Sequence, residues 1–254
     1  MEATIDIAHA MQRVRHETRR RSLTTISVED ITPRMRRVVL QADDSFADFV
    51  SLSPDDHVKL FFQTPDGSQA MRDFTPRAFD VEAGRLTIDF ALHQAGPAMD
   101  WAVQARPGAK LEIGGPRGSM VVADDFDWYW LIGDETAMPA IGRWVEQMPA
   151  GKPVLTAIAI DDAGEKQTFA TQADWHPRWT LRSELGPDDA VSLQTLLAAE
   201  ELPPGDGFVF IAAEASVARA LRSVLVTRGQ PKAWIKAAGY WKRGQADTHE
   251  RIED

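Results

Sequence analysis

The segment Arg72-Asp73-Phe74-Thr75-Pro76-Arg77 combines residue types that core packing does not require. The guanidinium of Arg72 or Arg77 suits bidentate contact with a phosphate, and the ring of Phe74 offers a stacking face to a planar group. The hydroxyl of Thr75 adds a hydrogen-bonding group beside that ring. The segment therefore predicts a site for a ligand with a phosphate and a planar ring. The alternative is an exposed edge strand with ordinary surface arginines.

Two glycine-containing segments could bind the anionic part of such a ligand. In Gly114-Gly115-Pro116-Arg117-Gly118-Ser119, glycine lets backbone N–H groups approach an anion, and Arg117 and Ser119 could complete the site. A tight interdomain turn is the alternative there. In Gly133-Asp134-Glu135-Thr136-Ala137-Met138-Pro139-Ala140, a strand, a glycine turn and a helix start follow one another, which is a usual place for a pyrophosphate. Its two carboxylates would oppose a phosphate unless they point away.

Other reactive groups do not assemble into a site. His57, His93 and His176 are far apart and form no i, i+4 pair, so we expect no metal site. No G-x-S-x-G segment supplies a hydrolase nucleophile. The chain has no cysteine, which excludes disulfides, thiolate zinc sites and cysteine-ligated iron–sulfur clusters. Redox chemistry would therefore need an organic cofactor or a metal held by nitrogen and oxygen ligands.

The elements that position these segments predict two domains. From Ser22, short runs of Val, Ile, Leu and Phe alternate with turns rich in Pro, Gly and Asp, which is typical of an antiparallel barrel, and one helix over residues 98–105 interrupts it. After Asp124, strands alternate with helices, which predicts a parallel α/β sheet. The expected division is a basic N-terminal arm (1–21, solvated or helical), a barrel domain (22–124), an α/β domain (125–244) and a polar tail (245–254).

Composition limits the classes of function. The 254 residues carry a net charge of −10, which disfavours a nucleic-acid binder with a broad basic face. The hydrophobic content of 44 % is enough for a packed core. No apolar run approaches the roughly 18 residues of a membrane span, and the start lacks the order of a signal peptide. We expect a cytoplasmic monomer that binds neither membrane nor nucleic acid.

Taken in order, these segments resemble the siderophore-interacting protein family, flavin-dependent ferric-siderophore reductases related to the ferredoxin–NADP reductase fold. The resemblance covers residues 22–243, and its most specific piece is the string GDETAMPAIGRW. The remaining matching pieces are residues 32–37, 57–60, 92–93, 96–98, 101–102, 213–215 and 239–244. This resemblance implies a six-stranded antiparallel FAD-binding barrel followed by a parallel-sheet domain for a nicotinamide nucleotide.

The resemblance also implies roles for individual residues. Arg72 would contact the FAD diphosphate, Phe74 would stack on the isoalloxazine, and Thr75 would lie at the reactive edge of the flavin as the catalytic position. Phe74 stands where the family usually has Tyr, so we expect stacking to survive and affinity or redox potential to shift modestly. The other implied FAD contacts are Arg77, His93, Gly96, Pro97, Ala98, Trp101, Gly115, Arg117, Gly118 and Ser119. The implied nicotinamide-nucleotide contacts are Gly133, Asp134, Thr136, Pro139 and Glu214.

The implied activity transfers electrons from NADPH or NADH through FAD to siderophore-bound Fe(III), releasing Fe(II). The choice of donor stays open, since Arg178 and Arg182 could meet a 2′-phosphate while Asp161 and Asp162 could favour a free 2′-hydroxyl. Ferric siderophores are bulky and often anionic, so a local basic cluster is needed on this acidic protein. The candidates are Lys236, Tyr240, Trp241, Lys242 and Arg243, unless they form a solvated final strand and tail.

Two other functions fit the same residues. One is a general NAD(P)H flavin or ferric-chelate reductase without siderophore preference. The other is a non-catalytic siderophore-binding module. Two departures from the family pattern point to it: Phe74, and Ala213, where the family more often has Gly. No catalytic acid or base is expected in the reductase, because outer-sphere electron transfer needs none.

Overall fold

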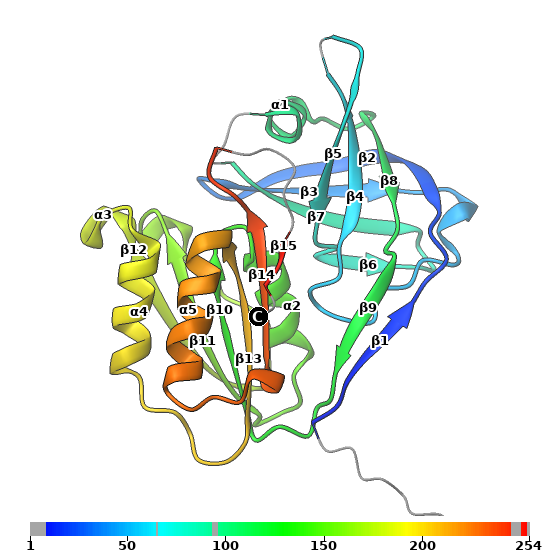
Figure 1. Ribbon diagram of the computed structural model, residues 1–254. Coiled ribbons are helices and arrows are strands. Elements are labelled where there is room, and N and C mark those ends of the chain that lie inside the picture. The colour runs from blue at the N-terminus through cyan, green and yellow to red at the C-terminus, as the bar shows by residue number, and fades with distance from the viewer. Residues whose placement is uncertain (1–8, 65, 93–95, 245–249, 253–254) are drawn as a thin grey trace, which may run out of the picture.

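The computed structural model describes residues 9–64, 66–92, 96–244 and 250–252. Figure 1 shows two lobes side by side, an antiparallel one formed by the first half of the chain and an α/β one formed by the second. Among the described residues, no helix is long and apolar enough to cross a membrane.

The first domain is built on a seven-stranded antiparallel sheet with the order β5-β4-β8-β2-β3-β7-β6. Side chains alternate between the two faces of each strand, so residues such as Leu23, Val38, Leu60 and Ile88 point into one core. The strands are β2 (Arg20–Thr32), β3 (Met35–Gln41), β4 (Val58–Gln63), β5 (Gln69–Phe74), β6 (Ala78–Asp80), β7 (Arg85–Ala91) and β8 (Lys110–Gly114). A short 3-10 helix (Asp44–Phe46) precedes β4, and α1 (Pro97–Gln104) precedes β8.

The predicted count of six strands is wrong by one. The strand expected at the chemically distinctive segment ends at Phe74, and Ala78–Asp80 forms the separate short strand β6. The intervening Pro76 has no N–H to donate to a ladder, so the strand is interrupted there. The helix predicted over residues 98–105 is confirmed, beginning one residue earlier at Pro97.

The N-terminal arm is neither helical nor freely solvated over its described part, contrary to expectation. Strand β1 (Met11–Arg15) pairs antiparallel with β9 (Gly118–Val122), and β2 already begins at Arg20. Pairing with β9 supplies backbone hydrogen bonds, so the basic side chains of β1 can stay at the surface. Ahead of β1, His9 lies between Asp125 and Asp206, with ring nitrogens 3.1 Å from each carboxylate. The arm is therefore attached to both domains.

The second domain is a six-stranded sheet with the order β12-β11-β10-β13-β14-β15, in which only the two-residue β15 is antiparallel. The strands are β10 (Trp128–Asp134), β11 (Pro153–Ile160), β12 (Asp174–Leu181), β13 (Gly207–Glu214), β14 (Ile235–Trp241) and β15 (Glu250–Arg251). The helices are α2 (Met138–Gln147), α3 (Arg182–Leu185), α4 (Asp189–Ala199) and α5 (Ala215–Thr227), with 3-10 turns at Ala163–Glu165 and Lys232–Trp234. The predicted alternation of strands and helices is confirmed.

Both faces of this sheet are buried, which explains why its central strands read as continuous apolar runs. Along β10, Tyr129 and Leu131 pack with Trp144 of α2 on one face. Trp130 and Ile132 pack with Leu221 of α5 on the opposite face. The helices therefore fix the sheet from both sides and leave its carboxyl edge for a ligand.

Candidate functional site

Arg72, Phe74 and Thr75 lie at the end of β5, where the first domain meets the second. Phe74 is half-buried and packs against Phe90, with ring centroids 4.7 Å apart and the planes tilted by 45°. Arg72 is half-buried and donates one hydrogen bond to the carbonyl of Met71 at 2.7 Å. Thr75 is buried, and a side-chain hydrogen bond joins it to Tyr240 of β14. Residues 72–75 are thus held in contact with the second domain through β14.

The start of α1 offers backbone donors without a side-chain cap. Gly96 occupies the N-cap with a φ of 149°, and Pro97 follows at the first turn. Among the described residues, which leave out 93–95, no side chain caps the first N–H groups of this helix, which packs against β4, the neighbour of β5. A helix N-terminus of this kind favours an anion. Together with a guanidinium and an aromatic ring on β5, these donors fit the diphosphate and ring system of FAD.

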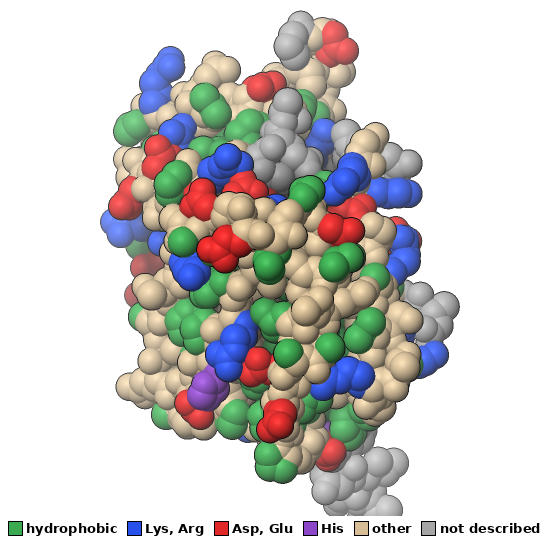
Figure 2. All heavy atoms as spheres, turned by 90° about the vertical axis from the view of Figure 1, so that its left-hand side faces the viewer, with side chains coloured by type: hydrophobic (Ala, Val, Ile, Leu, Met, Phe, Trp, Pro, Cys, Tyr) green, Lys and Arg blue, Asp and Glu red, His purple; other side chains and the backbone are tan. Residues whose placement is uncertain are grey.

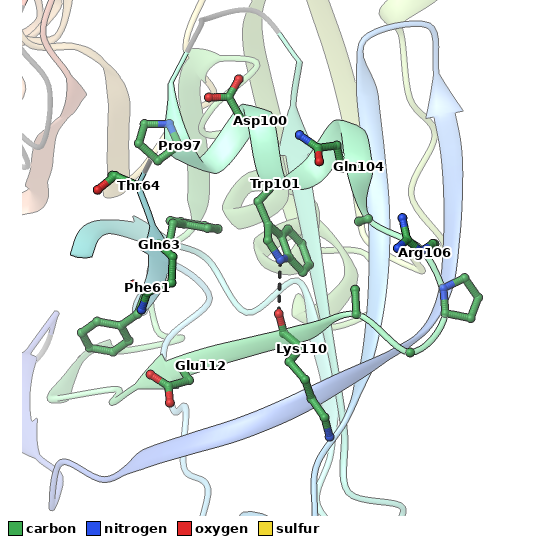
Figure 3. Close-up of a pocket in the computed structure, with 15 residues that line it drawn as sticks. Phe61, Gln63, Thr64, Pro97, Asp100, Trp101, Gln104, Arg106, Lys110 and Glu112 are labelled. Atoms are coloured by element: carbon green, nitrogen blue, oxygen red, sulfur yellow. Dashed lines mark hydrogen bonds between the residues drawn. The ribbon is translucent and has the colours of Figure 1, made fainter. Parts of the chain in front are cut away.

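A hollow of about 990 Å³ adjoins α1, between that helix, β4 and the approach to β8. Figure 3 shows Trp101 in its middle, with its indole N–H donating to the carbonyl of Lys110 at 3.2 Å. Aromatic side chains and both signs of charge border the hollow, which suits a planar polar ligand. Pro97 and Trp101 line it; His93 lies outside the described residues, and its predicted contact with FAD stays a prediction.

In the segment from Gly115 to Ser119, Gly118 and Ser119 contact other parts of the first domain and the N-terminal arm. A Cβ at Gly118 would lie 2.5 Å from the carbonyl oxygen of Val14, so pairing with β1 requires this glycine. Ser119 is buried, donates to Asp56 at 2.6 Å and accepts from the backbone N–H of Leu52 at 3.1 Å. Arg117 is exposed. The FAD contacts expected from this segment, including that of Gly115, stay predictions.

Arg77 is placed in a contact between the two domains. Its guanidinium forms two hydrogen bonds with Glu146 of α2, at 2.6 and 2.7 Å, and lies 5.8 Å from the centre of the Phe169 ring. The side chain is nearly buried, at 9 % exposure. Arg77 therefore fastens α2 to the first domain, and its predicted contact with FAD stays a prediction.

A buried polar cluster between the domains was not anticipated from the sequence. Asp55 pairs with Lys236 of β14 at 2.7 Å, and Asp56 accepts hydrogen bonds from the Ser51 hydroxyl, the Ser53 N–H and the Ser119 hydroxyl. Arg143 of α2 is also buried and donates to Ser51 at 3.1 Å. Ser119 and Lys236 are candidate binding residues from the sequence, but the sequence does not show that Ser119 meets Asp56 or that Lys236 meets Asp55 across the domain boundary.

Burial raises the pKa values of the acids in this cluster, whereas the neighbouring cation and hydrogen-bond donors lower them. Burial opposes the charged form of Asp55, but the ammonium of Lys236 outweighs it and holds the pKa of Asp55 below its usual value. For Asp56, burial prevails over its hydrogen bonds and raises the pKa. Burial likewise raises the pKa of Tyr240 well above its usual value, so this side chain stays a neutral phenol.

The five residues expected to bind the siderophore do not form one exposed basic cluster. Lys236 is committed to Asp55, Tyr240 to Thr75, and the indole of Trp241 donates to Asp134 at 2.8 Å. Lys242 is half-buried, and Arg243 is exposed. Only the last two leave a charge near the surface, because alternate side chains of β14 turn toward the first domain.

Asp134 and Glu214 lie at the carboxyl ends of β10 and β13, and both accept hydrogen bonds from neighbouring groups of the protein. Asp134 accepts from the N–H and hydroxyl of Thr136, the N–H of Glu214 and the indole of Trp241. Glu214 accepts from the N–H groups of Ser216 and Val217 at the start of α5. Because the carboxylate of Asp134 turns inward to these donors, it does not oppose a phosphate at the edge of the sheet. Its contact with the nucleotide, and those of Thr136, Pro139 and Glu214, stay predictions.

Replacing Gly133 by alanine is expected to lower the free energy of unfolding by about 2 kcal/mol, within the usual range for overpacking a core. A Cβ there would lie 2.4 Å from the carbonyl oxygen of Ala212 and 2.6 Å from the Cβ of Ala137. The neighbouring strand cannot give way, because β10 and β13 are paired continuously from Trp128 and Gly207 to Gly133 and Ala212. Urea unfolding followed by circular dichroism measures the change. Gly151→Ala, at a turn with open space around it but a φ of 74°, separates backbone strain from this clash.

Among the described residues, no group of three or more His, Cys, Asp or Glu side chains is arranged to hold a metal ion.

The candidate site consists of an antiparallel domain with anion donors and aromatic rings, joined at Thr75 to the edge of a parallel sheet. The fold and the site define a reductase of the ferredoxin-reductase type, with one domain for a flavin and one for a nicotinamide nucleotide.

Comparison with known proteins identifies the family. Residues 126–244 match the siderophore-interacting protein family, and residues 24–71 and 64–120 match the siderophore-interacting FAD-binding domain. The chain is 33 % identical to the NADPH-dependent ferric-chelate reductase of Escherichia coli, over 91 % of this chain and 96 % of that one. It is 26 % identical to the ferric vibriobactin reductase ViuB of Vibrio cholerae, over 89 % and 90 %. The protein belongs to the siderophore-interacting protein family.

A solved structure agrees with this assignment. A siderophore utilization protein from T. fusca superimposes with a TM-score of 0.86 at 32 % identity, over 94 % of this chain and 98 % of that one. The predicted family and the predicted fold, an antiparallel FAD-binding domain followed by a parallel-sheet domain, are therefore confirmed.

Proposed function

We propose that this protein is a ferric-siderophore reductase that uses NAD(P)H as electron donor and FAD as resident cofactor. The observation that carries the proposal is the hydrogen bond between Thr75 and Tyr240, which joins the end of β5 to β14. The predicted flavin site and the carboxyl edge of the nucleotide sheet are thereby held together. Family membership and the names of the two reductases support the same activity.

The residues of the first domain bind and orient the cofactor. Arg72 and the uncapped start of α1 receive the diphosphate, because both present donors to an anion. Phe74, supported from behind by Phe90, supplies the stacking face. When bound, FAD converts the two-electron donor into one-electron transfers to Fe(III). Trp101 and the hollow around it receive a further part of the cofactor.

The second domain brings the donor to that site and keeps water from it. Arg77 and Glu146 hold α2 against the first domain, and Lys236 and Asp55 hold β14 in the same way. These contacts fix the distance between the two ligand sites, which governs electron transfer. Lys242 and the exposed Arg243 attract the anionic siderophore, while Lys236, Tyr240 and Trp241 support the site from within.

The proposal includes the oligomeric state and the compartment of the protein. The protein acts as a monomer in the cytoplasm, where nicotinamide nucleotides are available. A second candidate function is a ferric-chelate reductase of broad specificity, which the name of the Escherichia coli relative favours. The absence of a large basic cluster at residues 236–243 of the described chain also favours it, since a small anionic chelate needs fewer cations.

The test begins with protein incubated with FAD and freed of unbound cofactor. A retained flavin spectrum that bleaches anaerobically on addition of NADH or NADPH is expected. Ferric siderophore added next should restore the oxidised spectrum, with Fe(II) trapped by a chelator in a ratio of two per nicotinamide. Equal rates with ferric citrate would favour the broad reductase. A protein that retains no flavin, or whose flavin does not bleach, would contradict both.

A further inference from the structure

The carboxyl ends of three neighbouring strands meet at one arginine. Strands β10, β11 and β12 are adjacent and parallel, and each is followed at once by a charged residue: Glu135, Asp161 and Arg182 respectively. Asp189, at the start of α4, completes the group. In open α/β sheets this edge receives the nucleotide, and the end of the strand next to the first contacts the adenosine ribose.

All five N–H donors of Arg182 are already used. Its Nε donates to Asp189 at 2.8 Å, Nη1 donates to Glu135 and Asp161 at 3.0 Å each, and Nη2 donates to Glu135 at 2.7 Å and Asp189 at 2.6 Å. The guanidinium is mostly buried, at 17 % exposure. The neighbouring carboxylates raise its pKa despite burial. A phosphate arriving here would find no free donor on Arg182.

Two other arginines near this edge, Arg178 and Arg34, are also paired with acids, although both are about half exposed. Arg178 forms a two-bonded pair with Glu200, at 3.0 and 3.1 Å, and Arg34 of the first domain pairs with Asp161. Arg34 and Arg182 thus face the carboxylates of Glu135, Asp161 and Asp189, and the exposed Asp162 follows directly in sequence. Figure 2 shows acidic and basic side chains interspersed over the side of this domain that carries α3 and α4, with no single basic patch in view.

We propose that this cluster makes the protein selective for NADH over NADPH, an inference that rests on the proposed reductase function. The 2′-hydroxyl of NADH donates a hydrogen bond to the Asp161–Asp162 carboxylates. The 2′-phosphate of NADPH places about two negative charges beside them, with every donor of Arg182 occupied. Glu135, Asp161 and Asp189 act as specificity-determining residues by holding Arg182 away from the phosphate.

The wild-type protein tests the inference with two readouts. Isothermal titration of 5′-AMP and of 2′,5′-ADP, which differ only in the 2′-phosphate, measures the effect of that group without any redox step, and 5′-AMP is expected to bind at least tenfold more tightly. In anaerobic reduction of the FAD-loaded protein, kcat/KM for NADH should exceed that for NADPH by at least tenfold. Tighter or equal binding of 2′,5′-ADP, no binding of either fragment, or faster reduction by NADPH would overturn the inference.

Variants test the assigned residues. Glu135→Gln combined with Asp161→Asn frees donors of Arg182, so the preference for 5′-AMP over 2′,5′-ADP should fall at least fivefold. Glu82→Gln, an exposed acid in the turn before β7, removes a charge elsewhere and should leave the ratio unchanged. An unchanged ratio in a folded double variant would overturn the roles of Glu135 and Asp161. If that variant does not fold, the wild-type ratio of the two fragments decides.

The two proposals fail separately. Selective binding of 5′-AMP over 2′,5′-ADP by a protein whose flavin neither NADH nor NADPH reduces would overturn the reductase function and leave the fragment selectivity standing. Flavin reduction with NADPH preferred would overturn the donor selectivity and leave the reductase function standing.

Discussion

Replacing Lys236 by alanine is expected to lower the free energy of unfolding by about 3 kcal/mol, the lower end of the range for breaking a buried ion pair. Its ammonium lies 2.7 Å from the carboxylate of Asp55, and the two side chains are only 20 % and 9 % exposed. Removal of the cation leaves Asp55 charged and desolvated between the domains. Urea unfolding of the full chain at pH 7 measures the change.

Two controls separate charge from packing and from substrate binding. Lys236→Met keeps the apolar stem, so it should cost nearly as much as alanine if the lost charge is responsible. Adding Asp55→Asn to it should recover much of the stability, since no buried charge then remains. Lys242→Ala, at a half-buried position of the same segment, should change stability by less than about 0.5 kcal/mol. A stable Lys236→Ala protein with a raised KM for ferric siderophore would instead support a direct substrate contact.

The stability that the pair of Lys236 and Asp55 contributes changes with pH in a defined direction. Lys236 holds the folded-state pKa of Asp55 below its usual value, so the pair stabilises the wild type above about pH 4 and this contribution is lost as the pH falls further. In Lys236→Ala, burial acts on Asp55 without the opposing ammonium, and only the hydrogen bonds from the Ser53 hydroxyl and the backbone still lower its pKa. The pKa of Asp55 is therefore higher in the variant than in the wild type, and Asp55 becomes protonated at a higher pH. The difference in stability between the two proteins should therefore shrink as the pH falls toward 4, and a constant difference would contradict the assigned cause.

Local patterns predicted the fold where an element is defined by its own residues. The apolar runs of β10, β11 and β13 and the helices between them follow from periodicity, because both sheet faces are buried. Strand β1 was missed because its basic residues show no apolar alternation and its partner β9 lies about a hundred residues away. A strand whose stability comes from a distant partner leaves no local signal.

The candidate site shows the same difference between features defined by nearby residues and contacts between distant ones. The segments at residues 72–77 and 133–140 could be proposed as sites from sequence because their distinctive residues are close together in the chain. Contacts between the two domains could not be predicted in this way, since Arg77 meets Glu146 across 69 residues and Lys236 meets Asp55 across 181. Charged residues read as solvated in sequence become interdomain contacts once the fold brings opposite charges together. This is why Lys236 was assigned to the substrate, whereas the structure pairs it with Asp55.

Asp134→Asn is expected to lower the free energy of unfolding by about 3 kcal/mol, because a carboxylate that accepts four hydrogen bonds is replaced by an amide. Asp134 is 1 % exposed, and its two oxygens accept from Thr136 twice, Glu214 and Trp241. Whichever way the amide turns, its NH₂ group faces a donor. The affected bonds join the ends of β10, β13 and β14, so binding of the nicotinamide nucleotide should weaken together with stability.

A double-mutant cycle locates the cause. Trp241→Phe removes one of the four donors and should cost about 1 kcal/mol alone. Combined with Asp134→Asn, it should cost at least 0.5 kcal/mol less than the sum of the single changes, since an NH₂ group turned to that side then faces one donor, the N–H of Glu214, in place of two. Asp124→Asn, ahead of β10 and outside this network, is the matched control and should leave stability nearly unchanged. Additive effects of the two substitutions would show that Trp241 and Asp134 are not coupled, and the edge of the sheet would then depend on backbone packing alone.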